Sequence, residues 1–565
     1  MLFRSKDLKA VESLGCVSVI CSDKTGTLTQ NKMTVQQVYI NHQTMEADAL
    51  DLKQQSHRYL LYDAILTNDS AIVEGQSIGD PTEVALLEMG RKADIKEDIL
   101  KEMMPRMEEI PFDSDRKLMS TKYRLHGVPT ILVKGALDIL LKRTDRIRIG
   151  DEIRPITEQD VKEILDKNQA FSEQGLRVLA FAYKEAQANQ QLTLDEEDHL
   201  IFIGLVSMID PPREESREAV SEAKRAGIRP VMITGDHKIT ATAIAEQIGI
   251  FGEGDMAVTG PELDEMSDAE LDENIEKISV YARVSPENKI RIVDAWQRKG
   301  AVTAMTGDGV NDAPALKKAD IGVAMGITGT EVSKDAASMI LTDDNFATII
   351  KAVANGRNVY RNIKNAVKFL LSGNMAGIMA VLYTSLAALP VPFQPVHLLF
   401  INLLTDSLPA IAIGMEKSEK DLLSEQPRDP KQGILTKDLM TALFVQGGLI
   451  AVCTMIAFYI GLSTDSATAS SMAFATLTLA RLFHGFNCRS IHSIFKIGLA
   501  SNIYSVGAFF GGVLLLALVI FVPVMRTLFT VSPLSGYQIG MIALLAFIPT
   551  VIIQLYKVMK EHVHA

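Results

Sequence analysis

An aspartate, a lysine and several hydroxyl residues follow one another near the start of this sequence, in the segment 21–29, CSDKTGTLT. The preceding segment 17–20, VSVI, is β-branched and apolar, which is typical of a buried parallel strand. Such a strand would deliver Asp23 to its carboxyl end, the edge at which open α/β sheets bind ligands. With Lys24 and Thr25 beside it, a carboxylate in that position can attack a phosphoryl group as a nucleophile.

Three further segments are apolar and end in small, hydroxylic or acidic residues. Residues 229–233 precede Thr-Gly-Asp at 234–236, residues 302–305 precede TGDGVND at 306–312, and residues 321–325 precede Gly326. Helical patterns fill the intervals between these segments, as parallel crossover connections require. The four segments therefore predict one doubly wound α/β site for a phosphate and its Mg²⁺.

Charge suggests a role for each polar residue of this predicted site. Carboxylates such as Asp23 and Asp308 supply oxygen ligands to a hard cation, which neutralises an incoming phosphoryl group. Lys289 can reach the transferred phosphoryl group as a point charge. We expect catalysis from Asp23, Thr234, Lys289 and Asp312, Mg²⁺ binding from Asp23, Thr25 and Asp308, and contacts to phosphate or nucleotide from Thr234, Gly235, Asp236 and Asn311.

The segment 23–29, DKTGTLT, resembles the phosphorylation motif of the P-type ATPases, a branch of the haloacid dehalogenase superfamily. In that family the aspartate becomes an aspartyl-phosphate while ions cross a membrane. The segment 210–213, DPPR, and the motifs described above are similar to the same family. The resemblance implies a haloacid-dehalogenase-like α/β phosphorylation domain at 1–35 and 205–355, an inserted α/β nucleotide-binding domain at 36–204, and a six-helix transmembrane bundle at 356–565.

The predicted insertion contains four residues that can bind a nucleotide. Phe112 can stack on an adenine ring, although a lone phenylalanine is more often part of a core. Lys134 precedes a small-residue turn, Gly-Ala, that lets a nucleotide approach. Glu83 and Arg177 can bind its amino group and phosphates. Together the four residues resemble the nucleotide-binding domain of the cation pumps, which implies ATP as the substrate.

The second part of the chain, after about residue 360, is strongly apolar, whereas charges occur throughout the first part. Because the 565 residues carry a net charge of -12, nucleic acid is not an expected partner. Positive charges gather on one side of the predicted spans, which places the first part and both termini in the cytoplasm of a cell-membrane protein. Six segments have the length and apolarity of membrane helices, at about 365–388, 396–415, 439–462, 469–488, 502–525 and 537–556.

One predicted span carries Asn402, Thr405 and Asp406, whose spacing of i, i+3 and i+4 would place them on one helix face. A carboxylate in the middle of a bilayer is costly and by default functional, although such polar groups can also join helices by hydrogen bonds. Asn374 supplies a further oxygen from the preceding predicted helix. Oxygen ligands of this kind suit Ca²⁺ and Mn²⁺, and they leave Na⁺ and H⁺ open as alternatives.

This pair of helices resembles the calcium-pump branch of the family, including the segment 402–406, NLLTD. Two-ion members of that branch carry acids at two positions that by alignment are Gly377 and Arg481 here. Both differences remove negative charge, and an arginine would repel Ca²⁺ from a second site. The sequence therefore predicts one Ca²⁺ per cycle, bound by Asn374, Asn402, Thr405 and Asp406.

The family's actuator domain and first four membrane helices have no counterpart in this sequence, which we therefore expect to be the C-terminal portion of a longer pump. That portion would contain what phosphorylation by ATP requires but would not complete transport alone, so a separate N-terminal pump fragment is an expected partner. A membrane-tethered phosphatase of the haloacid dehalogenase type and a transport-incompetent remnant are the alternatives. Such phosphatases usually carry a second acid two residues after the nucleophile, where this sequence has Thr25.

Overall fold

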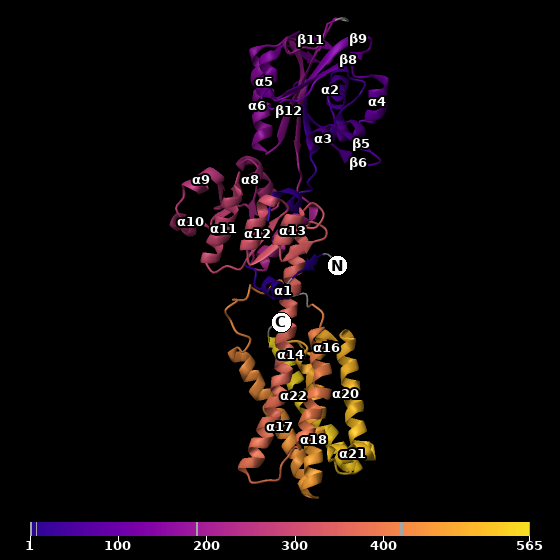
Figure 1. The fold of residues 1–565 in the computed structure, drawn as a ribbon, viewed down its shortest axis with the longest axis vertical. Helices are drawn as coiled ribbons and strands as arrows, with labels where there is room; N and C mark the ends of the chain where they lie inside the picture. The colour runs from indigo at the N-terminus through magenta and orange to yellow at the C-terminus, as the bar shows by residue number, and fades with distance from the viewer. Residues whose placement is uncertain (1–2, 7, 188–189, 419–421, 564–565) are drawn as a thin grey trace. The chain divides into compact units, whose positions relative to one another are not determined.

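The computed structural model describes residues 3–6, 8–187, 190–418 and 422–563 (Figure 1). The contacts within the chain divide it into two compact units. The α/β unit consists of Met1–Lys6 with Val17–Ile350, and the helical unit consists of Asp7–Cys16 with Lys351–Ala565. The three domains predicted from the sequence stay a prediction, because this division separates only two bodies.

An eight-stranded sheet contains all four strands predicted around Asp23. They are adjacent and parallel, in the order β18, β17, β2 and β14, and almost all of their residues are buried. Only β1 at one edge runs antiparallel to its neighbour. In order across the sheet the strands are β1 (Phe3–Ser5), β19 (Met339–Leu341), β18 (Ile321–Met325), β17 (Thr303–Gly307), β2 (Val19–Asp23), β14 (Arg229–Ile233), β16 (Ile278–Ala282) and β15 (Met256–Thr259).

Helices connect the parallel strands of this sheet, as crossover connections require. Local sequence explains where they begin. In α11, for example, the Ser285 hydroxyl accepts a hydrogen bond from the Asn288 amide at 3.2 Å, and the Asn288 side chain accepts one from the Ser285 amide at 2.9 Å. Pro286 occupies the first turn, where its missing N–H is not needed. The main crossover helices are α7 (Glu214–Arg225), α8 (Lys238–Gln247), α11 (Pro286–Arg298) and α12 (Ala313–Lys318).

A second, nine-stranded sheet is formed by the segment between β2 and α7, and most of its strand pairs are antiparallel. Helices α2 (Gln55–Leu66) and α3 (Pro81–Lys92) share an apolar core with it. In chain order the strands are β3 (Thr34–Ile40), β4 (Gln43–Glu46), β7 (Glu108–Ile110), β8 (Leu118–Leu125), β9 (Val128–Gly135), β10 (Thr144–Ile149), β11 (Glu152–Pro155), β12 (Arg177–Glu185) and β13 (Leu200–Ile209).

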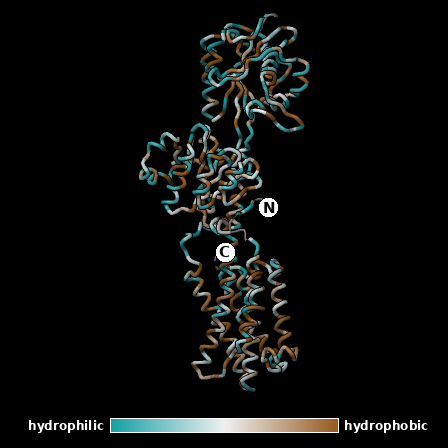
Figure 2. Tube along the Cα trace, in the orientation of Figure 1, coloured by the Kyte–Doolittle hydropathy of each residue, from teal (hydrophilic) through white to brown (hydrophobic). Residues whose placement is uncertain are grey.

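The second unit is helical, and apolar residues run along most of its helices (Figure 2). Within the described residues, five helical spans are long and apolar enough to cross a membrane. They are α14 (Phe346–Leu386), the span Pro395–Gly414 that contains α15 (Pro395–Leu399) and α16 (Ser407–Gly414), α17 (Lys437–Leu462), α20 (Ile503–Phe521) and α22 (Gly536–Val563).

The sixth predicted span, 469–488, corresponds to α18 (Ser466–Cys488), which is not among these five. Its residues include Arg481, His484 and Asn487, so it is more polar than α16, α17, α20 and α22. Nearly all of α18 is buried, and it contacts α17, α20 and α22. Neighbouring helices, and not lipid, therefore surround the polar side chains of α18.

Candidate functional site

Asp23 lies at the carboxyl end of β2, where the central strands of the eight-stranded sheet end. Its backbone amide donates a hydrogen bond of 2.9 Å to the hydroxyl of Thr306, in the adjacent strand. The turn after Asp23 contains Gly26 with φ of +73°, a conformation that other residues rarely adopt. This turn buries Lys24, whose ammonium group lies 2.5 Å from the Asp236 carboxylate. The Asp23 carboxylate is thus held at the sheet edge by its backbone.

Lys289 joins the two carboxylates on either side of it. Its Nζ lies 3.0 Å from Oδ2 of Asp23 and 2.6 Å from Oδ1 of Asp312. Burial alone would lower the pKa of Lys289, but the two carboxylates outweigh burial and raise that pKa. Burial also raises the pKa of Asp23, against the opposing effect of Lys289. Lys289 therefore lies beside Asp23, and its contact with a transferred phosphoryl group stays a prediction.

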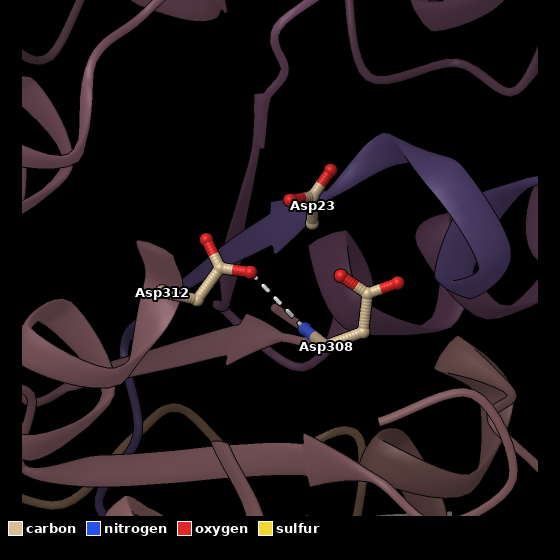
Figure 3. Close-up of side chains that lie close together, drawn as sticks. All are labelled: Asp23, Asp308 and Asp312. Carbon is tan, nitrogen blue, oxygen red and sulfur yellow. Dashed lines mark hydrogen bonds between the residues drawn. The ribbon is translucent and has the colours of Figure 1, made fainter. Parts of the chain in front are cut away.

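Three carboxylates converge at this edge, those of Asp23, Asp308 and Asp312 (Figure 3). Each offers an oxygen atom within 4.8 Å of the other two. Oδ2 of Asp312 accepts hydrogen bonds from the backbone amides of Asp308 at 3.1 Å and Gly309 at 3.0 Å. Gly307 permits this approach, because a Cβ atom there would lie only 2.4 Å from that of Asp312. We call these three residues the three-carboxylate cluster.

The three-carboxylate cluster suits a hard divalent cation. Its ligand atoms are carboxylate oxygens, which Mg²⁺ prefers, and Lys289 offsets only part of their negative charge. Burial, together with the neighbouring Asp23 and Asp312, raises the pKa of Asp308. A cation bound at this position would relieve the repulsion between the carboxylates. The residues present therefore fit Mg²⁺.

The other residues predicted for this site are placed around the cluster with different partners. Thr234 is buried, and its hydroxyl accepts a hydrogen bond of 3.1 Å from the Asp236 amide. The Asp236 carboxylate is paired with Lys24, which the sequence did not predict. Gly235 and Asn311 are exposed, and Thr25 is half-buried and lies outside the three-carboxylate cluster. Direct contacts among the described side chains thus join Lys289 to the cluster, but not Asn311 or Thr25.

Thr306 is a site residue to which the sequence analysis assigned no role. Its hydroxyl, besides accepting from the Asp23 amide, lies 3.4 Å from the hydroxyl of Ser22, and both side chains are fully buried. The available signal was the place of Thr306 directly after an apolar segment and before Gly307 and Asp308. Thr306 anchors the strand end that carries Asp23 to the strand end that carries Asp308.

A cavity of about 700 Å³ lies in the part of the α/β unit built on the nine-stranded sheet. All four residues predicted to bind a nucleotide line it, namely Glu83, Phe112, Lys134 and Arg177. Phe112 is 61% exposed. Gly135 permits a close approach of the chain at Lys117, since a Cβ atom there would lie 2.2 Å from the Lys117 carbonyl oxygen. The cavity offers an aromatic surface and cationic groups to one ligand.

Glu83 and Lys134 form an ion pair inside this cavity, with 2.7 Å between Oε1 and Nζ. The other carboxylate oxygen of Glu83 accepts hydrogen bonds from the amides of Asp69 and Ser70, both at 3.1 Å. Arg177 donates a hydrogen bond of 3.0 Å to the Thr82 hydroxyl. Burial lowers the pKa of Lys134, against the opposing effect of Glu83. Glu83 therefore positions Lys134 at the cavity wall.

Asp63 of α2 is a buried acid close to this cavity that the sequence analysis did not single out. Its side chain is fully buried, and its two carboxylate oxygens have no hydrogen-bond partner of good geometry among the described residues. Burial raises the pKa of Asp63 to about 7, although the nearby Lys134 opposes that shift. The available signal in the sequence was one acidic residue among the apolar residues of this helix.

The helical unit contains a buried ion pair at the predicted ion site. The guanidinium group of Arg481, in α18, pairs with the Asp406 carboxylate, and both side chains are almost completely buried. Arg481 also donates a hydrogen bond of 3.1 Å to the amide oxygen of Asn374. Gly373 provides the space, because a Cβ atom there would lie 2.4 Å from Nε of Arg481. Two of the predicted cation ligands are therefore held by an arginine.

Asn402, Thr405 and Asp406 lie in an irregular stretch of helix and differ in exposure. Residues Phe400–Thr405 form a π-helical turn, in which the Asp406 amide bonds to the Ile401 carbonyl at 2.9 Å, five residues earlier. Thr405 and Asp406 are buried whereas Asn402 is exposed, and the role of the three residues as cation ligands stays a prediction. The Thr405 hydroxyl donates to the Ile401 carbonyl at 3.0 Å.

Comparison with known protein families gives two matches. Residues 56–215 match a family model described as "P-type ATPase, cytoplasmic domain N". Residues 390–559 match one described as "Cation transporting ATPase, C-terminus". The first match includes the cavity with Phe112 and Lys134, and the second includes Asp406 and Arg481. The cavity and the Arg481–Asp406 pair thus lie inside the matched segments, whereas the three-carboxylate cluster lies outside both of them.

Curated proteins with similar sequences are named as calcium pumps. A calcium-transporting ATPase of Lactococcus lactis is 48% identical over 98% of this chain, and one of Listeria monocytogenes is 46% identical over 98%. The human calcium-transporting ATPase type 2C member 1 is 36% identical over 94% of this chain. The matched regions cover 63%, 64% and 59% of these relatives. The chain thus spans less than two thirds of their length.

Proposed function

We propose that this chain, which belongs to the P-type ATPases, provides the phosphoryl-accepting and ion-binding part of an ATP-driven Ca²⁺ pump. The observation that carries the proposal is the contact of Lys289 with both Asp23 and Asp312 beside Asp308. A nucleophilic carboxylate, a cation aimed at it and two further carboxylates at the end of one parallel sheet are what phosphoryl transfer requires. The relatives named as calcium-transporting ATPases support Ca²⁺ as the transported ion.

In the proposed reaction Asp23 attacks the γ-phosphorus of ATP. The new bond joins a carboxylate oxygen of Asp23 to phosphorus, and the bond from phosphorus to the oxygen of the β-phosphate breaks, so that ADP leaves with the electron pair. Lys289 places its positive charge beside the attacked group and prevents repulsion between Asp23 and Asp312. Thr306 fixes the backbone of the nucleophile. We assign Thr234 and Gly235 to the binding of phosphate oxygens.

Mg²⁺ would be held by Asp23 and Asp308, with Thr25 as the third predicted ligand. When bound, the ion neutralises charge on the transferred phosphoryl group. Asp312 stays engaged by Lys289 and by two backbone amides, so we assign it to the positioning of Lys289. The three-carboxylate cluster supports the assignment of Mg²⁺ to this position.

We infer a domain arrangement that agrees with this chemistry. The parallel sheet around β2 supports a haloacid-dehalogenase-like phosphorylation domain at 1–35 and 205–355. The nine-stranded sheet and its cavity support a nucleotide-binding domain at 36–204, in which Phe112 stacks on adenine and Glu83, Lys134 and Arg177 bind its polar groups. Residues 356–565 would form a six-helix bundle in the cell membrane, with α18 at its centre and both termini in the cytoplasm.

We infer that one Ca²⁺ is carried per cycle. Arg481 lies against Asp406 and Asn374, so one fixed positive charge already occupies oxygen ligands at this position. Release of Asp406 and Asn374 from Arg481, with Thr405 and Asn402, would form a single oxygen-lined site, and a second cation beside the guanidinium group would be repelled. Measurement of the Ca²⁺ taken up per ATP hydrolysed by pump-containing vesicles tests this stoichiometry. A ratio near one agrees with it, and a ratio near two contradicts it. Mn²⁺, Na⁺ and H⁺ are the alternative ions for the same assay.

One experiment separates the pump from a membrane-tethered phosphatase. The purified chain is incubated with radiolabelled ATP and Mg²⁺, and excess ADP is then added. A pump-type phosphoenzyme is expected to be long-lived, because Thr25 stands where a phosphatase carries the second acid that assists hydrolysis. Such a phosphoenzyme can transfer its labelled phosphoryl group to the added ADP and form ATP again. Rapid hydrolysis of p-nitrophenyl phosphate without an ADP-sensitive intermediate would favour the phosphatase. Addition of an N-terminal portion of a related pump, as a separate chain, tests whether such a fragment is needed for sustained turnover.

A further inference from the structure

A cavity of about 400 Å³ lies within the helical unit, apart from the buried ion pair. It lies between α1 (Leu8–Leu14), the first half of α14 and the start of α17. Five basic and three acidic side chains line it. Nothing in the proposed phosphoryl transfer or ion binding uses these residues.

Two of the basic residues have no counter-charge. Lys364 and Lys368 are half-buried, and neither forms a salt bridge or a side-chain hydrogen bond with any residue that the structure describes. They are four residues apart on α14, so both ammonium groups are on the same face of the helix. Two like charges on neighbouring turns, without an acid between them, favour an anion from outside the chain.

The other charged groups leave these lysines uncompensated. Arg361 is paired with Glu425 at 2.7 Å. The Arg428 guanidinium group lies 3.7 Å from the centre of the Tyr360 ring and 3.8 Å from Glu12. Two of the three acidic residues are therefore already close to arginines. The third, Asp438, is exposed at the start of α17 and forms no salt bridge with either lysine among the described residues.

The cavity also has an apolar side at the membrane boundary. Leu439, Ala442 and Ile491 line it beside the charged groups. The membrane spans predicted from the sequence begin at about residue 365 in α14 and at about residue 439 in α17. Positive side chains above an apolar wall, at the end of membrane helices, match the head group and first acyl carbons of a lipid.

We propose that this cavity binds the phosphate group of an anionic phospholipid, with Lys364 and Lys368 as its main cationic contacts. The lysines lie at the start of the membrane span predicted for α14, a helix that begins at Phe346. The proposal goes beyond the pump function and does not depend on ATP, so a failure of either leaves the other intact. Free inorganic phosphate has the same charged group, and the experiment must separate the two sources.

The test is lipid binding by the purified full chain in detergent, measured by native mass spectrometry with phosphatidylglycerol and phosphatidylcholine. We expect phosphatidylglycerol to bind more tightly. Lys364→Gln and Lys368→Gln are each expected to weaken its binding about fivefold, from the typical contribution of one lysine near an anionic surface. The matched control is Lys351→Gln, an exposed lysine of the same helix that does not line the cavity, which should leave binding unchanged.

Three outcomes would overturn the proposal. The first is phosphatidylglycerol affinity within twofold of the wild type in both variants. The second is equal affinity for the two lipids in the wild type. The third is displacement of the bound lipid from the wild type by millimolar inorganic phosphate. That result would assign the cavity to a soluble anion. Lys364→Arg keeps the charge and should retain binding, so it distinguishes a lost contact from a variant that does not fold.

Discussion

The guanidinium group of Arg481 is paired with the Asp406 carboxylate inside the helical unit, although the two residues lie 75 positions apart. The pair is almost completely buried, and among the described side chains Asn374 is the one that forms a further hydrogen bond with it. A buried carboxylate without this partner would be an uncompensated charge, which is strongly unfavourable. Asp406 therefore requires a cation, and in this structure the protein supplies it.

Replacement of Arg481 by methionine is expected to transfer that requirement to a cation from solution. We expect Arg481→Met to lower the midpoint of thermal unfolding in chelator, because loss of one member of a buried pair costs about 3–5 kcal/mol. Added Ca²⁺ should restore much of the loss. The double variant Arg481→Met with Asp406→Asn removes both charges and is the control, since it should be less destabilised and insensitive to Ca²⁺. Equal losses in the two variants, with no response to Ca²⁺, would contradict this account.

Lys289→Gln should reduce phosphoenzyme formation about 100-fold, which is typical for loss of one charged or hydrogen-bonding group that stabilises a transition state. The reason is that Lys289 contacts both Asp23 and Asp312, so its loss leaves two carboxylates in repulsion. Radiolabelling with ATP measures the effect. Lys299→Gln, at the exposed end of the same helix, should label like the wild type. Normal labelling of Lys289→Gln would remove Lys289 from the mechanism.

Phe112→Ala should weaken nucleotide binding about 10-fold, since stacking of a base on an aromatic ring contributes about 1–3 kcal/mol. Phe112 is 61% exposed, so its removal should not alter folding. Titration with a fluorescent ATP analogue measures the affinity, and Phe112→Trp should retain it. Leu194→Ala, an equally exposed apolar residue that does not line the cavity, is the matched control. Unchanged affinity in Phe112→Ala would place the adenine elsewhere.

Asp63 predicts a pH dependence of local stability. Its pKa is raised to about 7 in the fold by burial, from 3.8 otherwise, so the folded chain retains a proton that the unfolded chain loses. Stability should therefore fall as pH rises from about 4 to about 7 and then level off, with a total loss of up to about 4 kcal/mol at about 1.4 kcal/mol per pKa unit.

Hydrogen exchange of the α2 amides, corrected for intrinsic rates, measures this change as a free energy of local opening. Asp63→Asn cannot ionise, so its protection of α2 should not fall with pH between 5 and 8. The same decline in the variant and the wild type would show that another group is responsible.

Much of the candidate site around Asp23 could be predicted because its parts are local. Each strand and the turn after it are encoded by one short segment, and parallel strands bring their carboxyl ends to one edge. Asp23 and Asp308 therefore converge as expected. The pairing of Lys24 with Asp236 could not be predicted, since it depends on a turn whose shape is set by Gly26 and by packing.

The helical unit was harder to predict. Helical spacing predicted a regular helix through Asn402 and Asp406, but the structure has a π-helical turn there, and no pattern of residue types reveals such a turn. The sequence indicated that Arg481 would repel a second cation. It did not indicate that Arg481 itself binds Asp406, which depends on the space left by Gly373. The polarity of α18 likewise becomes understandable only once its neighbours bury it.

The most direct test of the central claim asks whether Asp23 accepts the γ-phosphoryl group of ATP. The purified chain is incubated with γ-labelled ATP, Mg²⁺ and Ca²⁺, quenched in acid and separated on an acidic gel. We predict one label per chain at most, stable in acid and released by hydroxylamine at neutral pH, as an acyl phosphate requires. Asp23→Asn should carry no label while it binds ATP normally, because the nucleotide cavity does not include this residue. Label that persists in Asp23→Asn, or its absence from a wild-type chain that binds ATP, would contradict the account.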